Sequence, residues 1–483
     1  MRFFILLLLL LVFSLNNTFA QDKVVEIKPT DKYKFLGYEY AENGLFYITT
    51  GKGKKPKAQI KVVNYDQDLN VIYEKNNKKS KFEPLPAFFG RGMNDAPHYY
   101  DLFATTNGKY TISKIDRYII DSEGNHNPFN FEKYKETEDI KMFFTFYSDN
   151  YACYLGKIIK EITRKNRNEP KDDNIYFFRR SLSDQTTKKI ALQIPPIVTE
   201  EEKISFGLHS FDENGFYIIN KVLEKESSID VYNILNYNYE GELISNRSLK
   251  VTLDNKYFSA SNCGFGSSSI VYNNRFTFHK LNDDATGNVY IDNVNGEYYV
   301  FGLYSNKKDL DLYNARNNGF YVKKYSFNGE LIWSSINNIT DKDYNKNSVS
   351  YHTTVAFFDL ENDQKGIRIS NSNHDYSFMF LFNDSDGKVT KDKKVEFKVS
   401  KTKLYGIRSG AFPTGYSSKA DFGKNDLNVD TFFAAFLSPK VAAFFETVKD
   451  ESNNYNSFIL DSGIYILEEN EDKEAFRLMK FEY

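Results

Sequence analysis

The residues best suited to binding a ligand lie in two long segments that contain several glycines. The later segment places an arginine and three aromatic residues close together: Tyr405, Arg408, Phe412 and Tyr416. The earlier one, residues 262–269, combines Phe265 with small residues. Aromatic residues and arginine dominate binding hot spots because they bury much area and offer directional polar contacts. We therefore expect one or both segments to form a ligand-binding or partner-binding surface, the competing interpretation being ordinary insertions whose aromatic residues cover the ends of the fold.

Sequence signatures of catalysis and of cofactor binding are absent. The chain contains no H-E-x-x-H, C-x-x-C, G-x-S-x-G or Walker A sequence. Two segments have the alternating oxygen ligands of a calcium loop, but 384–387 lacks the terminal glutamate and 426–430 lacks the glycine. Asp and Asn bond their own backbone in turns, which explains both segments. We expect no metal and no cofactor.

These absences favour a binding or scaffold protein of unknown ligand over an enzyme. The alternative is a carbohydrate-active enzyme, a glycoside hydrolase or lyase, that uses a pair of acidic residues on the same scaffold. Acidic residues are plentiful, so the sequence cannot select a pair. The partner we expect is a protein or a glycan. Nucleic acid is not expected, because the formal net charge is only −2 and nucleic-acid binders carry concentrated basic surface.

A repeated hairpin organises most of the chain. Each copy has an aromatic or β-branched strand, a polar turn and a second strand, as in ILNYNYEGELIS from Ile234 and KKYSFNGELIWS from Lys323. Three turns carry a glycine that supplies the positive φ of tight hairpins: Gly241, Gly329 and Gly387. The turn centres lie near residues 67, 123, 184, 240, 328, 386 and 471. The common step is about 57 residues, with two longer intervals whose extra residues we expect to form loops.

The hairpins YNYEGELI and YSFNGELIW resemble the outer hairpin of secreted β-propellers. The resemblance implies an all-β, propeller-like domain over residues 21–483, with about six or seven repeated antiparallel sheets. The alternative is a pair of β-sandwich domains, since short strands with turn signals fit that fold as well. The best helix candidate, 431–448, is interrupted by Pro439, which we expect to split it into two strand-length pieces.

Residues 1–20 have the three parts of a secretory signal peptide. Arg2 is followed by an apolar stretch, and small residues stand at Thr18 and Ala20 before the expected cleavage point. The apolar stretch is shorter than the roughly 20 residues that span a membrane. We expect a soluble, secreted or periplasmic protein without a transmembrane segment after cleavage. Export makes a bridge between Cys153 and Cys263 chemically possible, the alternative being two buried free thiols.

The first prediction concerns this processing. Cleavage after Ala20 makes Gln21 the mature N-terminus, which intact-mass measurement of the exported protein checks. A mass that retains residues 1–20, found in the membrane fraction, would contradict the signal-peptide interpretation.

Overall fold

The fold is known from a computed structural model. It describes residues 23–27, 33–40, 46–52, 59–77, 102–104, 109–113, 118–121, 123, 125–129, 140–158, 174–195, 205–224, 229–259, 262–265, 288–292, 295–307, 316–342, 344, 353–360, 364–371, 376–396, 434, 436–447, 454–460, 462–469 and 476–482. The expected signal peptide, 1–20, lies outside these residues.

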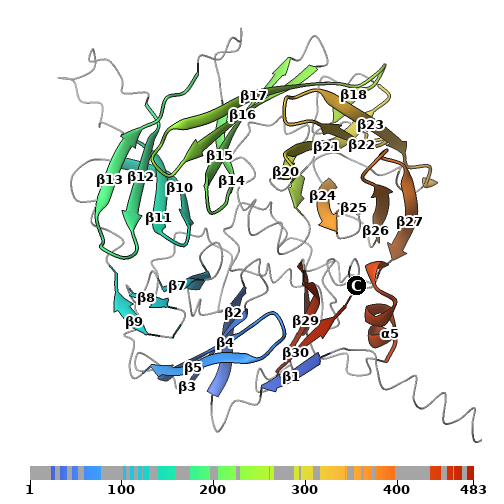
Figure 1. Cartoon of the computed structure of the whole chain (residues 1–483). Helices are drawn as coiled ribbons and strands as arrows, with labels where there is room; N and C mark the ends of the chain where they lie inside the picture. The colour runs from blue at the N-terminus through green and yellow to red at the C-terminus, as the bar shows by residue number, and fades with distance from the viewer. Residues whose placement is uncertain are drawn as a thin grey trace, which may run out of the picture.

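The described strands form seven sheets that stand around a common axis (Figure 1). Five of the sheets are four-stranded and antiparallel, and two have five strands. This ring is a β-propeller, the fold that the repeated hairpins predict. The alternative prediction of two β-sandwich domains does not describe this arrangement.

The sheets are numbered here from 1 to 7 along the chain. Sheets 1 and 2 comprise β2 (Tyr33–Tyr40), β3 (Phe46–Lys52), β4 (Gln59–Tyr65) and β5 (Val71–Asn77), then β6 (Leu102–Ala104), β7 (Tyr110–Ser113), β8 (Tyr118–Asp121) and β9 (His126–Pro128). Sheets 3 and 4 comprise β10 (Ile140–Tyr147), β11 (Tyr151–Ile158), β12 (Tyr176–Ser181) and β13 (Thr187–Ala191), then β14 (Ser205–Phe211), β15 (Gly215–Glu224), β16 (Ile229–Asn238) and β17 (Leu243–Thr252).

The remaining three sheets are less regular. Sheet 5 comprises β18 (Tyr257–Ser259), β20 (Asn288–Asp292), β21 (Glu297–Ser305), β22 (Gly319–Tyr325) and β23 (Leu331–Asn338). Sheet 6 comprises β19 (Asn262–Phe265), β24 (Thr353–Leu360), β25 (Gln364–Asn371), β26 (Tyr376–Asn383) and β27 (Val389–Glu396). Sheet 7 comprises β28 (Asn454–Leu460), β29 (Gly463–Glu469), β30 (Phe476–Phe481) and the N-terminal strand β1 (Lys23–Ile27).

Burial explains why the middle strands contain so many aromatic residues. Every residue of β22 is buried, and so is nearly all of β21, because both faces of these strands pack against neighbouring sheets. The outer strand β17 instead alternates exposed and less exposed residues over most of its length. Aromatic rings join consecutive sheets, as where Phe301 of β21 stacks on Phe357 of β24 at 5.2 Å between ring centroids.

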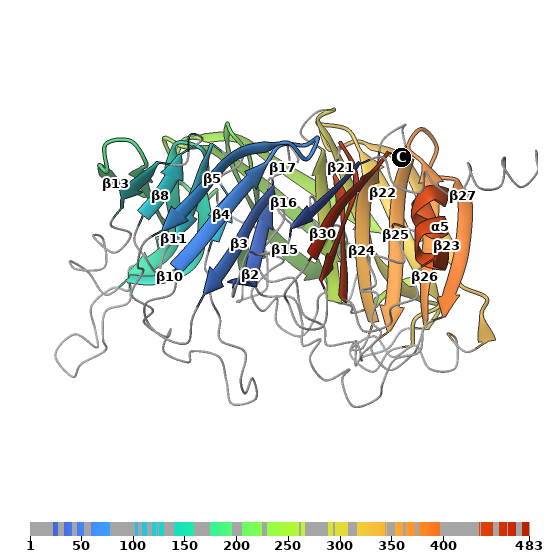
Figure 2. The same ribbon diagram turned by 90° about the horizontal axis from the view of Figure 1, so that it is seen from below.

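Most of the predicted hairpins are confirmed, and one is misplaced. The turn centres near 67, 123, 184, 240, 328 and 386 connect the last two strands of sheets 1 to 6. The centre near 471 instead falls between β29 and β30, because β1 supplies the last strand of sheet 7. β1 pairs with β30 from Lys23 opposite Lys480 to Ile27 opposite Phe476, so the two ends of the described chain close the ring. Figure 2 shows the sheets from the side.

The first long interval, between residues 240 and 328, does not form loops alone as predicted. Part of it forms β18, which pairs antiparallel with β21, and β19, which pairs in parallel with β24 of sheet 6. A sheet edge presents unpaired backbone groups, and a passing chain segment satisfies them by adding a strand.

Residues 431–448, the best helix candidate, are helical where they are described, with an interruption at Ser438 before Pro439. The expected strand-length pieces are wrong, because Pro439 begins helix α5 (Pro439–Thr447). Proline is favoured at the first helical position, where its missing N–H leaves no hydrogen bond unmade. The helix packs Phe444 against Phe481 of sheet 7, at 5.6 Å between ring centroids. The Lys391 Nζ of sheet 6 donates to the Phe436 carbonyl oxygen at 2.8 Å, so this segment fills the contact between sheets 6 and 7. Among the described residues, no helix is long and apolar enough to cross a membrane.

Two hairpin glycines generate a stability prediction. Gly329 and Gly387 both have φ in the left-handed region, at 84° and 68°. A Cβ at Gly387 would lie 2.5 Å from the Trp333 ring, whereas the nearest atom at Gly329 is 3.4 Å away. We expect Gly329→Ala to cost about 1–2 kcal/mol from backbone strain. Gly387→Ala should cost about 1–3 kcal/mol more from overpacking. Denaturant unfolding of the two variants checks this order, and equal losses would contradict it.

Candidate functional site

The structure tests little of the ligand surface predicted from the sequence. Tyr405, Arg408, Phe412 and Tyr416 all lie outside the described residues, so that part remains a prediction. Phe265 is described by its backbone alone. It ends β19, opposite Phe357 in the parallel register with β24. That position is beside a strand whose Phe357 side chain is fully buried in the core.

Cys153 is a buried free thiol, so the proposed bridge to Cys263 is not formed. The two residues belong to strands of different sheets, β11 of sheet 3 and β19 of sheet 6. A disulfide needs the two Cα atoms within about 7 Å of each other. Burial raises the pKa of the Cys153 thiol well above its ordinary value, an effect that the nearby Arg179 charge opposes. A buried thiol with a raised pKa is a structural residue and a poor nucleophile.

A polar cluster joins sheets 5 and 6. Lys324 Nζ, on β22, lies 2.9 Å from Asp384 Oδ2 in the last turn of sheet 6 and 2.7 Å from Glu297 Oε2 at the start of β21. Tyr299 donates its hydroxyl hydrogen to Asp384 Oδ1 at 2.5 Å. Trp333 Nε1 donates to the Asp384 carbonyl oxygen at 2.7 Å. Only 8% of the Lys324 side chain and 13% of the Asp384 side chain are exposed.

The cluster sets the ionisation of its members. Burial would lower the pKa of Lys324, but its bonds to Glu297 and Asp384 and their charges outweigh burial and raise it. Burial and the Asp384 carboxylate together raise the pKa of Tyr299 well above its ordinary value. At neutral pH the lysine is therefore charged and the tyrosine is neutral. This arrangement binds the two sheets to each other.

Related contacts occur where sheet 3 meets sheet 4 and where sheet 7 meets sheet 1. Arg179, on β12, is paired through both guanidinium nitrogens with Glu240 in the last turn of sheet 4. Lys480, on β30, lies 2.9 Å from Asp68 in the last turn of sheet 1. We call these three contacts, including Lys324–Asp384, the junction clamps. Each joins a cation on one strand to an acid in the last turn of the following sheet.

The contact between sheets 4 and 5 is built differently. Lys324 pairs across the strands with Tyr299, and Lys480 with Tyr465. In sheet 4 the corresponding pair is Asn236 with Tyr217, so an amide stands where the clamps have a cation.

The last turn of sheet 5 is held from another strand. Arg247, on β17, donates from Nε to the Phe327 carbonyl oxygen at 3.1 Å, and its guanidinium lies 4.9 Å from the centroid of the Phe327 ring. In sheet 4 the cation therefore lies on the outer strand β17. The third-strand position that carries Lys324 in sheet 5 and Lys480 in sheet 7 carries the shorter Asn236 in sheet 4.

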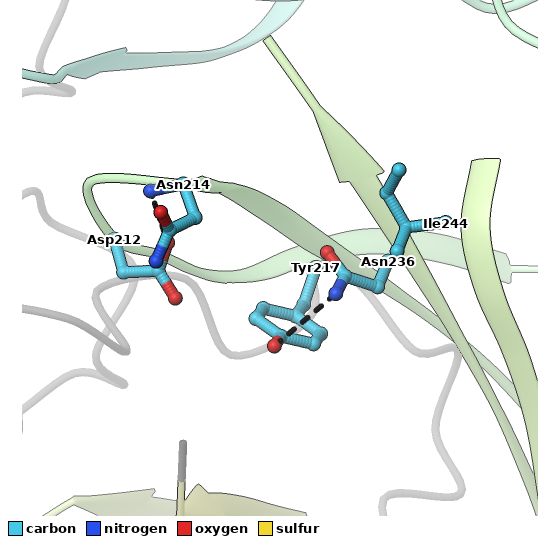
Figure 3. Close-up of a pocket in the computed structure, with 5 residues that line it drawn as sticks. All are labelled: Asp212, Asn214, Tyr217, Asn236 and Ile244. Carbon is cyan, nitrogen blue, oxygen red and sulfur yellow. Dashed lines mark hydrogen bonds between the residues drawn. The ribbon is translucent and has the colours of Figure 1, made fainter. Parts of the chain in front are cut away.

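A cavity of about 210 Å³ lies at this asparagine. Its lining comes from the first turn of sheet 4 and from three strands: Asp212, Asn214, Tyr217, Asn236 and Ile244 (Figure 3). Asn236 Nδ2 donates to the Tyr217 hydroxyl oxygen at 3.3 Å. Asp212 Oδ1 accepts hydrogen bonds from the backbone N–H groups of Asn214 and Gly215, at 2.7 and 3.0 Å, which fixes the carboxylate in the turn.

Burial governs the titration of the two ionisable groups in the lining. It raises the pKa of Asp212, and the neighbouring Glu213 adds to the effect, although the two backbone hydrogen bonds oppose it. It also raises the pKa of Tyr217, with smaller contributions from Asp212 and from Tyr298 of sheet 5. A cation placed beside these groups would favour the charged form of Asp212.

Sequence reasoning missed all five lining residues, although one signal was present. When the hairpins NYNYEGELI and KYSFNGELI are aligned on their Gly-Glu-Leu-Ile, Asn236 falls opposite Lys324. The asparagine that stands in place of the lysine in this alignment is one of the residues that line the cavity. Among the described residues, no group of three or more His, Cys, Asp or Glu side chains is placed to hold a metal ion.

Comparison with known proteins leaves the family open. No family model and no curated protein matches the chain. It is similar to the solved structure of a DUF4221 family member from Bacteroides vulgatus, with 13% identity, 96% of this chain and 97% of that chain covered, and a TM-score of 0.27.

Two further solved structures are similar over part of the chain. A mutant Synechocystis apocarotenoid oxygenase is 8% identical, with 73% of this chain and 58% of that chain covered, at a TM-score of 0.28. A eukaryotic initiation factor is 7% identical, with 77% and 90% covered, at a TM-score of 0.32. Likenesses at these scores carry no argument about function.

The junction clamps generate a prediction that depends on burial. Replacing Lys324 with Met leaves two carboxylates without their cation, which should cost about 3–5 kcal/mol. Lys480→Met is the matched control, because its partner Asp68 is 59% exposed and such pairs contribute at most about 1 kcal/mol. Urea unfolding at pH 7 measures both.

The raised pKa of Lys324 determines how the loss of stability in Lys324→Met depends on pH. A cation with a raised pKa stabilises the fold fully below its unfolded pKa, and this stabilisation is lost as pH rises through the folded pKa. The cost of Lys324→Met should therefore stay constant from pH 7 to pH 9. Equal costs for the two variants, or a cost that falls over this range, would contradict the assignment.

Proposed function

We propose that this chain is an exported, non-enzymatic binding or scaffold protein whose partner docks where sheets 4 and 5 meet. The observation that carries the proposal is the cavity beside apolar side chains that stay exposed. Ile244, which lines the cavity, is 59% exposed, and Phe327 in the adjacent turn of sheet 5 is 50% exposed. Leu331 and Ile332, at the start of the last strand of the same hairpin, are also exposed, at 52% and 49%. We call Ile244, Phe327, Leu331 and Ile332 the apolar rim.

Exposed apolar side chains next to a polar cavity suit a binding surface. An isolated exposed apolar residue needs no explanation, but a group beside a cavity is typical of interaction sites. Arg247 holds Phe327 in place from sheet 4, so the aromatic ring loses little conformational freedom on binding. Export is supported by the signal-peptide pattern of residues 1–20.

The alternative of a carbohydrate-active enzyme would require a suitable acid pair. The described residues bring Glu297 and Asp384 together, but the same Lys324 ammonium bonds both carboxylates. These contacts favour a structural role for this pair.

The proposal predicts a selective loss of binding. The double variant Ile244→Ser/Phe327→Ser removes two exposed apolar side chains at the cavity. The control Val71→Ser/Ile72→Ser removes two similarly exposed side chains from sheet 1. Both should change the melting temperature by only a few degrees, because surface substitutions cost little. The assay compares native protein and both variants, at equal concentration, on arrays of glycans and of exported proteins from the source organism.

The expected result is at least one ligand whose affinity falls about tenfold or more in the first variant and stays unchanged in the control. Equal binding by all three proteins, or equal loss in both variants, would refute the docking site. Hydrolysis of an arrayed polysaccharide by the native protein would favour the enzyme alternative.

A further inference from the structure

The outer strand of sheet 5 differs in charge from the outer strands of the other sheets. The outer strands, those at the outside edge of each sheet, are β5, β9, β13, β17, β23, β27 and β1. Figure 1 shows β13, β17 and β27 at the outside of the ring. The outer strand of sheet 5, β23, has the sequence LIWSSINN, which contains no charged residue, no proline and no glycine.

Every other outer strand contains a residue that protects an open edge. A strand edge presents unpaired N–H and C=O groups, and proteins discourage pairing there with charged residues, above all lysine, or with proline. The protecting residues include Lys75 in β5, Pro128 in β9, Lys188 in β13, Arg247 in β17, Lys393 in β27 and Lys23 in β1. β23 instead combines β-branched and aromatic residues with zero charge, a composition that favours pairing between strands.

The hydrogen bonds of the hairpin in sheet 5 fix which backbone groups of β23 face outward. At one end the Ser326 N–H donates to the Glu330 carbonyl oxygen, and at the other the Ile339 N–H donates to the Asn318 carbonyl oxygen, both at 2.9 Å. In an antiparallel pair, residues that bond to the neighbouring strand alternate with residues that do not. The register with β22 therefore directs the backbone N–H and C=O groups of three residues away from β22: Ser334, Ile336 and Asn338. No described strand pairs with this edge of β23.

The side chains along this edge are accessible. Ser334 and Asn338 are exposed, and Ile336 is half-buried. Leu331 and Ile332, at the start of the strand, are exposed apolar residues. An added strand would cover apolar surface that the single chain leaves in water, which favours association.

We propose that β23 pairs with β23 of a second copy of this chain, antiparallel and around a two-fold axis. The edge is self-complementary, because a strand without charge meets an identical strand without like-charge repulsion. The same pairing in β13 or β27 would bring lysines close to lysines. One register opposes all three outward residues to outward residues of the other copy. It places Ile336 on the axis and Ser334 of each copy opposite Asn338 of the other.

This inference goes beyond the proposed function. It depends on the edge of β23, whereas the docking site depends on the cavity and on Ile244 and Phe327, which lie outside β23. Leu331 and Ile332 are the residues that the two surfaces share.

Sedimentation velocity tests the pairing on the mature chain from Gln21, which contains every described strand. Between about 1 and 200 µM, the range in which small interfaces associate, the native protein should approach twice the monomer mass. Ser334→Pro removes an outward N–H and no bond to β22, so it should weaken self-association at least tenfold.

Asn246→Pro is the matched control, because Asn246 holds the same outward position on β17 when the two hairpins are aligned on Gly-Glu-Leu-Ile. Its self-association should stay within about threefold of the native value, as expected for a strand outside the interface. A native protein that stays monomeric throughout, or equal weakening by the two prolines, would overturn the proposal.

Disulfide trapping locates the contact. In the proposed register, positions 334 and 338 of different copies lie opposite each other with Cα atoms about 5.5 Å apart, within the range of a disulfide. The double variant Ser334→Cys/Asn338→Cys should therefore form a covalent dimer on mild oxidation. Each single variant should not, because the same position in the two copies is four residues apart along the paired strands, roughly 13 Å.

Oxidised native protein controls for the native cysteines, of which Cys153 is buried. No covalent dimer from the double variant, or equal dimer formation by the single variants, would refute the arrangement.

Discussion

The propeller depends on burying both faces of middle strands such as β12, β21 and β22, and this makes the contact between consecutive sheets the constraint that the rest of the structure must meet. Apolar rings fill most of each contact, but polar backbone groups of the turns lie at its end and need partners. The Lys324–Asp384 clamp meets that need: the lysine satisfies two carboxylates, while Trp333 and Tyr299 bond the same aspartate. A buried ion pair is tolerated when its hydrogen bonds are this complete.

Where the clamp cannot form, other parts of the chain take its place. Between sheets 6 and 7, sheet 6 has Leu381 at the register position that Lys324 occupies in sheet 5, so it offers no cation. The outer strand of sheet 7 is β1, so sheet 7 has no last hairpin turn that could supply the acid. Helix α5 and the segment before it fill that contact with Phe436 and Phe444. Between sheets 4 and 5, Arg247 holds the turn from the outer strand, and a cavity lined by residues of sheet 4 lies at Asn236. The cavity at Asn236 is thus a consequence of the contact between sheets 4 and 5 being held by Arg247 and not by a cation on the third strand.

The repeated hairpins were predictable because their signals are local. Turn residues and alternating strands fix each hairpin within about twelve residues, and six predicted turn centres are confirmed. The position of β1 and the edge strand β19 could not be predicted, since both depend on pairing between residues far apart in the sequence. Helix α5 lies within the best helix candidate, 431–448, but Pro439 was expected to leave only strand-length pieces, whereas it is the first residue of the helix. The cavity was missed because its lining converges from four separate elements. Tyr405, Arg408, Phe412 and Tyr416 remain a prediction for a second surface.

A double-mutant cycle on Lys324 and Asp384 tests the central claim that a charged contact between strand and turn ties neighbouring sheets together. The free energy of unfolding is measured for native protein, Lys324→Met, Asp384→Asn and the double variant. Residues 60 positions apart in the sequence can couple only through the folded contact between sheets 5 and 6. The account predicts a coupling free energy of at least about 1 kcal/mol, within the range for residues in one ion-pair network. Additivity within about 0.3 kcal/mol would show that the pair is incidental to how the sheets are joined.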